Sequence, residues 1–211
     1  MRSKGIYIIR HGESDCWGMN HTDYIPDLEW ALTWRGVEQA KSLWVMLAKR
    51  AIVFDIMYVS PKERAQETFN VMSNTYLNQR WTPMVGWCIH TSNEIRSRSF
   101  GKWERLPKKL VLNPSNEFDY YNDPYFSAPG GESSFDVYKR AVTFFQQIIQ
   151  QDWLIWVVSH SKVIECIHRY VSHLQNPWIL PFSFPKYETG NTEVIKIAPQ
   201  RDKNIPTFEE F

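Results

Sequence analysis

Residues 6–13 read IYIIRHGE: an apolar run long enough for a buried strand stops at the polar residues Arg10-His11-Gly12-Glu13. A second apolar run, WLIWVV at residues 153–158, stops in the same way at Ser159-His160. Short apolar runs of this kind are typical of strands that are covered on both faces of a sheet. Open α/β sheets bind ligands beyond the carboxyl ends of their strands, so we expect the two histidines at one ligand-binding edge.

The length and composition fit one globular domain. The chain has 211 residues, which is enough to bury a sizeable core. The chain has 24 Lys and Arg residues and 23 Asp and Glu residues, so its formal net charge is +1. Because the chain has no large excess of positive charge, we do not expect it to bind a nucleic acid. No run of about 18 apolar residues predicts a membrane span, and the residues before the first apolar run are too few for a signal peptide.

The cysteines indicate a reducing environment. They are odd in number and far apart in the chain: Cys16, Cys88 and Cys166. This spacing favours neither a disulfide framework nor a zinc site. We therefore expect a cytoplasmic protein that needs no metal and no cofactor.

Apolar patterning along the rest of the chain predicts strands and helices in alternation. Strands are expected at residues 6–9, 56–59, 85–90, 153–158 and 192–197. Helices are expected to follow Thr33, Ser60, Ser133 or Ser134, and His160. Ser60-Pro61 offers an N-cap followed by proline at the first helical position. Strands separated by helices imply βαβ units, so the predicted fold class is α/β, a three-layer α/β/α sandwich around a mainly parallel sheet.

The predicted domain spans residues 1–211 and carries one long insertion. From about residue 91 to residue 131 the pattern is irregular and is interrupted by Pro107, Pro114, Pro124 and Pro129. A stretch of this length is typical of a functional loop or lid. The tail after Pro199 is also expected to be irregular.

Four residues share a chemistry that suits a phosphate dianion. Arg10 and Arg64 each offer a planar fork of N–H donors that matches phosphoryl oxygens. His11 in its neutral form has a lone pair that can attack phosphorus, and nearby guanidiniums favour that form. His160 can donate a hydrogen bond to the phosphoryl oxygens as charge develops on them. Hydrolysis of a phosphate monoester can require an acceleration of ~10²¹-fold, so several such groups must converge.

Six short motifs follow one another along the chain. R-H-G-E is residues 10–13, L-T-x-x-G-x-x-Q-A is residues 32–40, and S-P-x-x-R-A-x-x-T is residues 60–68. G-x-W-E is residues 101–104, P-G-G-E-S is residues 129–133, and V-S-H is residues 158–160. In this order they resemble the histidine phosphatase superfamily, the phosphoglycerate mutase-like proteins. The resemblance covers nearly the whole chain and implies a phosphoglycerate mutase-like fold.

The resemblance also implies roles for individual residues. His11 is then the nucleophile that becomes phosphorylated. The phosphate pocket is then formed by Arg10, Arg64 and His160. The family's proton donor is a glutamate shortly before G-x-W-E, for which Glu94 is the closest match and Glu104 the alternative. Such a donor protonates the leaving oxygen and then helps to activate water.

Two departures from the family pattern bear on function. Ser161 stands where a glycine commonly follows the second histidine, which leaves the imidazole itself unchanged. The N-E-R-H-Y-G motif and the paired lid arginines of the mutase subfamily are missing. Their absence favours a phosphatase over a mutase.

We therefore expect a histidine acid phosphatase-type hydrolase that cleaves a phosphate monoester through a phosphohistidine on His11. A phosphoglycerate mutase-type phosphotransferase and a non-catalytic module that binds phospho-ligands are the alternatives. The expected partner is a small phosphorylated substrate, with no nucleic acid and no membrane, and a homodimer is left open. Basic residues of the lid are expected to select an anionic substrate with an aromatic or nucleotide part: Arg96, Arg98, Lys102, Arg105, Lys108 and Lys109.

Overall fold

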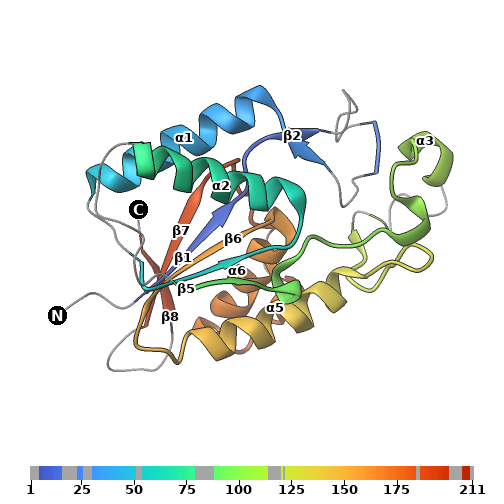
Figure 1. The fold of residues 1–211 in the computed structure, drawn as a ribbon. Coiled ribbons are helices and arrows are strands. Elements are labelled where there is room, and N and C mark those ends of the chain that lie inside the picture. Colours follow the sequence, from blue (N-terminus) through green and yellow to red (C-terminus); the bar gives the residue numbers. More distant parts are fainter. Residues whose placement is uncertain are drawn as a thin grey trace.

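The computed structural model describes residues 5–15, 23–25, 30–50, 54–78, 88–113, 120, 122–183, 186–199 and 206–209. These residues form three layers (Figure 1), with a six-stranded sheet in the middle. Helices α1 (Trp34–Lys49) and α2 (Glu63–Asn78) cover one face of the sheet, and α5 (Ser134–Ile148) and α6 (Ser161–Gln175) cover the other. The α/β/α sandwich expected from the sequence is confirmed. None of the helices in the described part of the chain combines the length and the apolar character needed to cross a bilayer.

The sheet has the strand order β5-β4-β6-β1-β7-β8. Its strands are β1 (Gly5–Arg10), β4 (Ile56–Val59), β5 (Cys88–Thr91), β6 (Leu154–Ser159), β7 (Val194–Pro199) and β8 (Pro206–Glu209). The pairs β5–β4, β4–β6 and β6–β1 are parallel. The pairs β1–β7 and β7–β8 are antiparallel. The sheet is therefore mainly parallel, as expected.

The central strand β1 contributes to a hydrophobic core on each face of the sheet. Ile6 and Ile8 belong to the core beneath α5 and α6, and Tyr7 and Ile9 to the core beneath α1 and α2. Successive side chains of a strand point to opposite faces, so a strand covered on both sides must be apolar throughout. This explains why residues 6–9 are all apolar instead of alternating between apolar and polar.

The register between β1 and β6 positions the two histidines. Arg10 lies opposite Ser159, and the backbone N–H of His11 donates to the Ser159 carbonyl at 3.0 Å. His160 follows Ser159 directly. Both imidazoles therefore leave the sheet at the same edge and at neighbouring positions.

Two of the helices begin where the sequence predicts a cap. The Thr33 hydroxyl accepts the N–H of Gly36 at the start of α1, at 3.0 Å. Ser133 and Asp136 form a reciprocal capping box at the start of α5. Both caps satisfy backbone donors that the first helical turn leaves unpaired.

The start of α2 differs from the expectation. The helix begins at Glu63 rather than Pro61, and the Lys62 carbonyl accepts its first N–H groups. The Ser60 hydroxyl accepts the Lys62 N–H at 3.3 Å and also lies 2.8 Å from Nε2 of His160. The prediction that Ser60 caps a helix with Pro61 at its first position was wrong, because both residues precede the first helical turn.

Several short strands also escaped prediction. β8 lies in the tail that was expected to be irregular, so that prediction was wrong; four residues of an edge strand pair with β7. A two-residue pair, β2 (Ser14–Asp15) with β3 (Ala31–Leu32), was likewise not foreseen. β7 begins at Val194, two residues later than expected, and residues 85–87 of the expected third strand lie outside the described residues.

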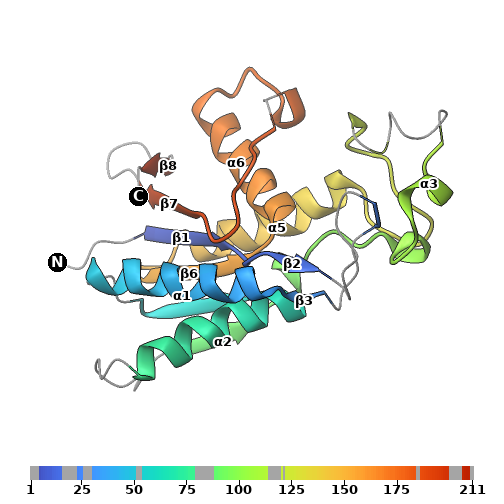
Figure 2. The same ribbon diagram turned by 90° about the horizontal axis from the view of Figure 1, so that it is seen from above.

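The insertion near residues 91–131 extends beyond the end of the sheet at which β1 leads into β2 (Figure 2). It is not wholly irregular, because it contains η1 (Asn93–Ile95), η2 (Gly101–Trp103) and α3 (Lys108–Val111). Backbone hydrogen bonds join it to residues 23–25: the Arg105 N–H donates to Ile25 at 3.1 Å, and the Lys108 N–H to Asp23 at 2.8 Å. Two segments that lie far apart in the sequence are thus linked through their main chains.

Arg96 and Arg98 make contacts within the protein that stabilise the insertion. Arg96 pairs with Glu132 at 2.8 Å. Arg98 donates to the carbonyls of Glu132 and Phe126, and its guanidinium lies 5.0 Å from the centre of the Phe100 ring. Both guanidiniums are therefore engaged within the protein, and the expectation that they help to select the substrate stays a prediction. The exposed basic residues of the insertion are Lys102, Arg105 and Lys109.

Gly36 provides a test of how tightly the R-H-G-E loop is packed. A Cβ added to Gly36 would lie 2.0 Å from the Glu13 carbonyl oxygen, whereas one added to Gly5 would lie 3.4 Å from Ile197, an ordinary contact. Alanine gains about 1 kcal/mol of helix propensity over glycine, but overpacking against backbone costs about 1–3 kcal/mol, so we expect Gly36→Ala to destabilise the protein. Urea unfolding measures this.

Gly5→Ala is the matched control for that measurement. Its unfolding free energy should stay within about 0.5 kcal/mol of the wild type. A Gly36→Ala protein that unfolds at the same urea concentration as the wild type would contradict the tight packing.

Candidate active site

His11 and His160 form the centre of a buried polar site. Their ring centroids are 5.0 Å apart, and their relative exposures are 5% and 2%. The sequence predicts this pairing from the two strand ends, and the structure places both rings at that edge of the sheet. Two imidazoles this close, and this far from water, disfavour a charge on either ring.

The partners of the His11 ring define its tautomer. Nδ1 lies 2.7 Å from the Gly12 carbonyl oxygen, which can only accept, so Nδ1 carries the proton. Nε2 accepts a hydrogen bond from Nε of Arg64 at 3.1 Å, so Nε2 carries a lone pair. The arrangement describes a neutral imidazole whose reactive nitrogen faces a guanidinium.

Arg64 is buried in the first turn of α2, and Thr68 ties that turn to the R-H-G-E loop. The Thr68 hydroxyl donates to the Arg64 carbonyl at 2.7 Å and accepts the Gly12 N–H at 3.0 Å. Arg64 is only 3% exposed. Its guanidinium is thus fixed beside His11 by both the helix and the loop.

Arg10 approaches the site from the end of β1. Its side chain donates to the Thr189 carbonyl, and Glu193 lies near enough to influence its charge. Burial lowers the pKa of Arg10, and the carboxylate of Glu193 partly opposes that shift. An arginine remains protonated at neutral pH all the same. Arg10 is therefore a second positive group, next to His11 in the chain, and its donors are turned partly toward the loop before β7.

The His160 ring is held by Ser60. The Ser60 hydroxyl lies 2.8 Å from Nε2 and accepts the Lys62 N–H at 3.3 Å. If the Ser60 hydroxyl donates a hydrogen bond to Nε2, the ring proton lies on Nδ1, for which the described ranges of the chain contain no hydrogen-bond partner. That N–H can then donate to a phosphoryl oxygen.

Burial is the main cause that lowers the pKa of His160 well below its usual range. The positive charges of Arg64, Lys62 and Arg140 add to that effect, and a proton on the neighbouring His11 ring would act in the same direction. The ring is therefore neutral at physiological pH. A neutral His160 can donate one hydrogen bond without adding to the repulsion among the surrounding cations.

Sequence reasoning missed Ser60, Lys62 and Thr68 as members of the site. Lys62 is only 6% exposed, and Ser60 and Thr68 are fully buried. All three lie in the S-P-x-x-R-A-x-x-T motif, so their spacing from Arg64 was the available signal. Thr68 lies four residues after Arg64 on α2, the spacing at which two side chains share one face of a helix.

The two candidate proton donors differ in their surroundings. Glu94 lies in η1 at the carboxyl edge of the sheet, and its side chain is exposed. Oε1 of Glu104 accepts from the Ser99 hydroxyl at 2.8 Å and from the Phe100 N–H at 2.9 Å. Glu104 therefore stabilises the turn around η2. Neither carboxylate has a recorded contact with His11 or His160 among the described residues.

The chemistry of the assembled groups suits a phosphate anion. Guanidiniums and a buried lysine lie near two imidazoles, of which His11 has a lone pair on Nε2 and His160 has no hydrogen-bond partner at Nδ1 within the described residues. Such a set can bind the phosphoryl oxygens and attack the phosphorus. Within the described residues, no group of three His, Cys, Asp or Glu side chains is placed to hold a metal ion.

The neutral state of His160 can be tested by titration. We expect its ring to stay neutral near pH 6, where an unperturbed histidine, with a pKa of about 6.5, is mostly protonated. The unfolded chain binds a proton there that the folded chain does not, so the unfolding free energy should fall as pH drops below about 6.5. NMR of labelled histidine rings reports the charge, and urea unfolding reports the slope.

His160→Asn is the control for this titration. The variant should lose part of the decline in unfolding free energy below about pH 6.5, because asparagine takes up no proton. A His160 signal that titrates with a midpoint at or above the ordinary value would contradict the buried, neutral ring.

Known proteins resemble this chain over most of its length. A 2,3-bisphosphoglycerate-dependent phosphoglycerate mutase of Treponema denticola is 25% identical, over 97% of this chain and 90% of its own. The structure of a mycobacterial glucosyl-3-phosphoglycerate phosphatase matches with a TM-score of 0.75 at 18% identity, covering 99% of this chain and 98% of that one. A putative alpha-ribazole-5'-P phosphatase from Escherichia coli matches with a TM-score of 0.75 at 23% identity, covering 99% and 95%.

A family model provides the assignment. The model described as the histidine phosphatase superfamily (branch 1) matches residues 6–207, a range that includes every residue of the site. Three of the motifs that carried the resemblance, R-H-G-E, S-P-x-x-R-A-x-x-T and V-S-H, supply the residues that the fold brings together around His11 and His160. The chain therefore belongs to the histidine phosphatase superfamily.

Proposed function

We propose that this protein is a phosphomonoesterase that hydrolyses a small phosphate ester through a phosphohistidine on His11. The observation that carries the proposal is the state of the His11 ring, with Nδ1 bonded to the Gly12 carbonyl at 2.7 Å and Nε2 3.1 Å from Nε of Arg64. A neutral imidazole with a fixed tautomer, next to a cation that can bind phosphoryl oxygens, suits nucleophilic attack on phosphorus.

In the first step the ester is cleaved. Arg64 turns its donors to the phosphoryl oxygens, and the lone pair on Nε2 of His11 forms a bond to phosphorus as the bond to the leaving oxygen breaks. The leaving oxygen takes a proton from Glu94 and departs as an alcohol. Arg10, Arg64 and the N–H of His160 meet the charge on the other three oxygens.

In the second step the phosphohistidine is hydrolysed. Water attacks phosphorus while Glu94, now a carboxylate, takes one of its protons. The phosphorus–nitrogen bond breaks, inorganic phosphate leaves, and Nε2 recovers its lone pair. The proton on Nδ1 stays in place throughout because the Gly12 carbonyl holds it.

Glu94 suits the donor role better than Glu104 does. A general acid must be able to approach the leaving oxygen, and the exposed Glu94 side chain is placed on η1 at the same strand edge as the histidines. The Glu104 carboxylate is already bonded to the Ser99 hydroxyl and the Phe100 N–H. Moving it would break the turn around η2.

The alternative is a mutase. The curated relatives at 25% identity include phosphoglycerate mutases, and a mutase would use the same phosphohistidine. Its phosphoenzyme would have to outlive the exchange of one product for the next substrate. A non-catalytic phospho-ligand module is a weaker candidate, because all four central residues are present.

We include in the same proposal the substrate class, the type of hydrolase, its location and its oligomeric state. The solved neighbours named as phosphatases act, by their names, on glucosyl-3-phosphoglycerate and on alpha-ribazole-5'-P, and they support a small phosphorylated substrate here. A histidine acid phosphatase-type hydrolase in the cytoplasm, working without a nucleic acid or a membrane, agrees with the balanced charge. A homodimer remains compatible with it.

Phosphate release tests the proposal. We expect release from p-nitrophenyl phosphate or from a panel of sugar phosphates, nucleotides, phosphoglycerates and phosphopeptides. His11→Ala should reduce it by at least roughly 10³-fold, because the nucleophile is lost. Arg64→Met should reduce it by about 10²–10³-fold, because a cation that stabilises the transition state is lost. Rapid quenching followed by mass spectrometry should find the phosphate on His11.

The same assays distinguish the alternatives. Transfer of phosphate between phosphoglycerates with little release of inorganic phosphate would identify a mutase. Binding of phosphate esters without turnover by the wild type would identify a module that only binds. Activity that survives His11→Ala would overturn the mechanism.

A further inference from the structure

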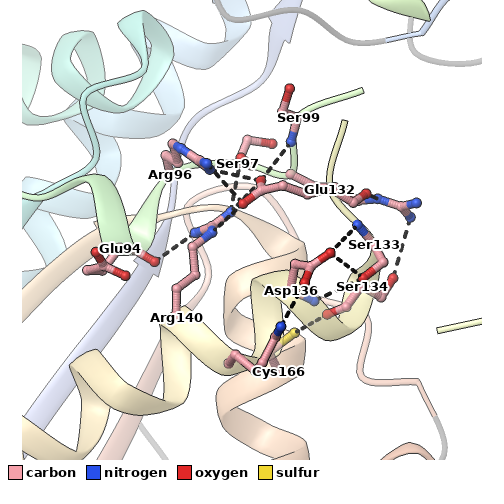
Figure 3. Close-up of polar contacts among 12 residues, drawn as sticks. Glu94, Arg96, Ser97, Ser99, Glu132, Ser133, Ser134, Asp136, Arg140 and Cys166 are labelled. Atoms are coloured by element: carbon pink, nitrogen blue, oxygen red, sulfur yellow. Dashed lines mark hydrogen bonds and ion pairs between the residues drawn. The ribbon is translucent and has the colours of Figure 1, made fainter. Parts of the chain in front are cut away.

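A buried ionic cluster lies beside the site and has no part in the mechanism above (Figure 3). The carboxylate of Glu132 accepts from both terminal nitrogens of Arg96, at 2.8 and 2.9 Å. It also accepts from Nε and Nη2 of Arg140, at 3.0 and 3.1 Å, and from the Ser99 N–H at 3.0 Å. One carboxylate thus holds two guanidiniums in fixed planes.

The charge of Glu132 is secured by its partners. Burial by itself would raise its pKa, but the hydrogen bonds from Arg140 and Ser99 and the charges of Arg140 and Arg96 outweigh burial and lower it. The side chain of Arg140 is only 11% exposed and that of Glu132 16%. The cluster is therefore ionised and largely shielded from solvent at neutral pH.

Arg140 has donors left over, and it uses them on η1. Nη1 donates to the Glu94 carbonyl at 2.7 Å, and Nη2 donates to the Ser97 carbonyl at 3.2 Å. Figure 3 shows the guanidinium between the Glu132 carboxylate and the backbone of Glu94. Only the planar fork of an arginine can serve both sides at once, since an ammonium group is a single point of charge.

Two further bonds fix η1 to the strand ends that carry the site. The Ser92 N–H donates to the Val59 carbonyl at 3.1 Å, and the Ser159 hydroxyl donates to the Ile95 carbonyl at 2.8 Å. Val59 directly precedes Ser60, and Ser159 directly precedes His160. The segment with Glu94 at its centre is therefore attached at three points, and Arg140 supplies the only charged one among the described residues.

We infer that Arg140 is a positioning residue that sets where the Glu94 carboxylate stands relative to His11, and that Glu132 and Arg96 orient Arg140. The inference rests on the proposed function, in which Glu94 is the proton donor. The Glu94 side chain has no hydrogen bond of its own within the described part of the chain, so its place depends on its backbone. A general acid must come within about 2.6–3.2 Å of the oxygen that it protonates.

The test compares two esters that differ in their need for a proton. p-Nitrophenyl phosphate releases a stable phenolate without help, whereas p-nitrobenzyl phosphate has nearly the same size but releases an alkoxide that must be protonated. We expect Arg140→Met to lower kcat/KM for the benzyl ester by about 10²-fold, the usual contribution of a general acid, and to change kcat/KM for the phenyl ester by less than about 5-fold. The ratio kcat/KM is compared because it reports the first step, before Glu94 acts as a base on the phosphohistidine that both esters share. Glu94→Gln should show the same selectivity.

Arg169→Met is the matched control for a purely structural loss. The Arg169 side chain is 5% exposed, against 11% for Arg140. It pairs with Glu165 at 2.9 Å and donates to the Pro181 carbonyl, but within the described residues its side chain makes no hydrogen bond to η1. We expect both Arg169→Met and Arg140→Met to lower the melting temperature. Arg169→Met should change the hydrolysis of the two esters to the same extent. If Arg140→Met does not fold, Glu132→Gln, which keeps the shape of the side chain, should give a smaller selective loss.

The outcomes separate this inference from the proposed function. Selectivity in Glu94→Gln with none in Arg140→Met or Glu132→Gln would overturn the positioning role and leave the proposed function standing. An equal loss on both esters in Arg140→Met would show a structural role only and would also overturn it. A Glu94→Gln protein without selectivity, beside an inactive His11→Ala, would refute Glu94 as the donor and the inference with it. A wild type that hydrolyses neither ester would count against both.

Discussion

Parallel pairing of β1 with β6 in one register is the constraint on which the rest of this site depends. The hydrogen bond from the His11 N–H to the Ser159 carbonyl closes that pairing at the edge of the sheet. Because β4 flanks β6 in the same direction, Ser60 and then Arg64 arrive at the same edge. A shift of one residue in either strand would turn its apolar side chains to the opposite face, so the two cores fix the register that the site needs.

The electrostatics of the site follow from that geometry. Arg64 and Lys62 are nearly inaccessible to water, and both lower the pKa of the buried His160 ring. Cations gathered in a region of low dielectric repel one another, and a dianion that enters between them relieves the repulsion. The neutral imidazoles supply a lone pair and a donor without adding positive charge. The pocket is therefore prepared for phosphate before any substrate arrives, which is the condition for electrostatic stabilisation of a transition state.

The sequence predicts those parts of the molecule that are set by local pattern. The buried strands, the cap at Ser133 and the convergence of His11 with His160 follow from apolar runs that end in polar residues. Ser60 could not be assigned to the site in this way, because a serine before a proline is typical of a helix cap. Its contact with His160 joins residues 100 positions apart, and no local pattern predicts such a contact. β8 is an edge strand of four residues, too short for a period to be seen. Arg96 reads as a solvated loop charge until the fold brings Glu132 against it, 36 positions away.

The joining of residues 23–25 to the insertion has a consequence for how such a protein diversifies. The bonds that connect Ile25 and Asp23 with Arg105, Leu106 and Lys108 run between main-chain atoms, so they persist whatever side chains the two segments carry. The link between these two segments is thus independent of the side chains that they carry. Substitutions there can change the surface of the insertion while the backbone frame, and the residues around His11, keep their places.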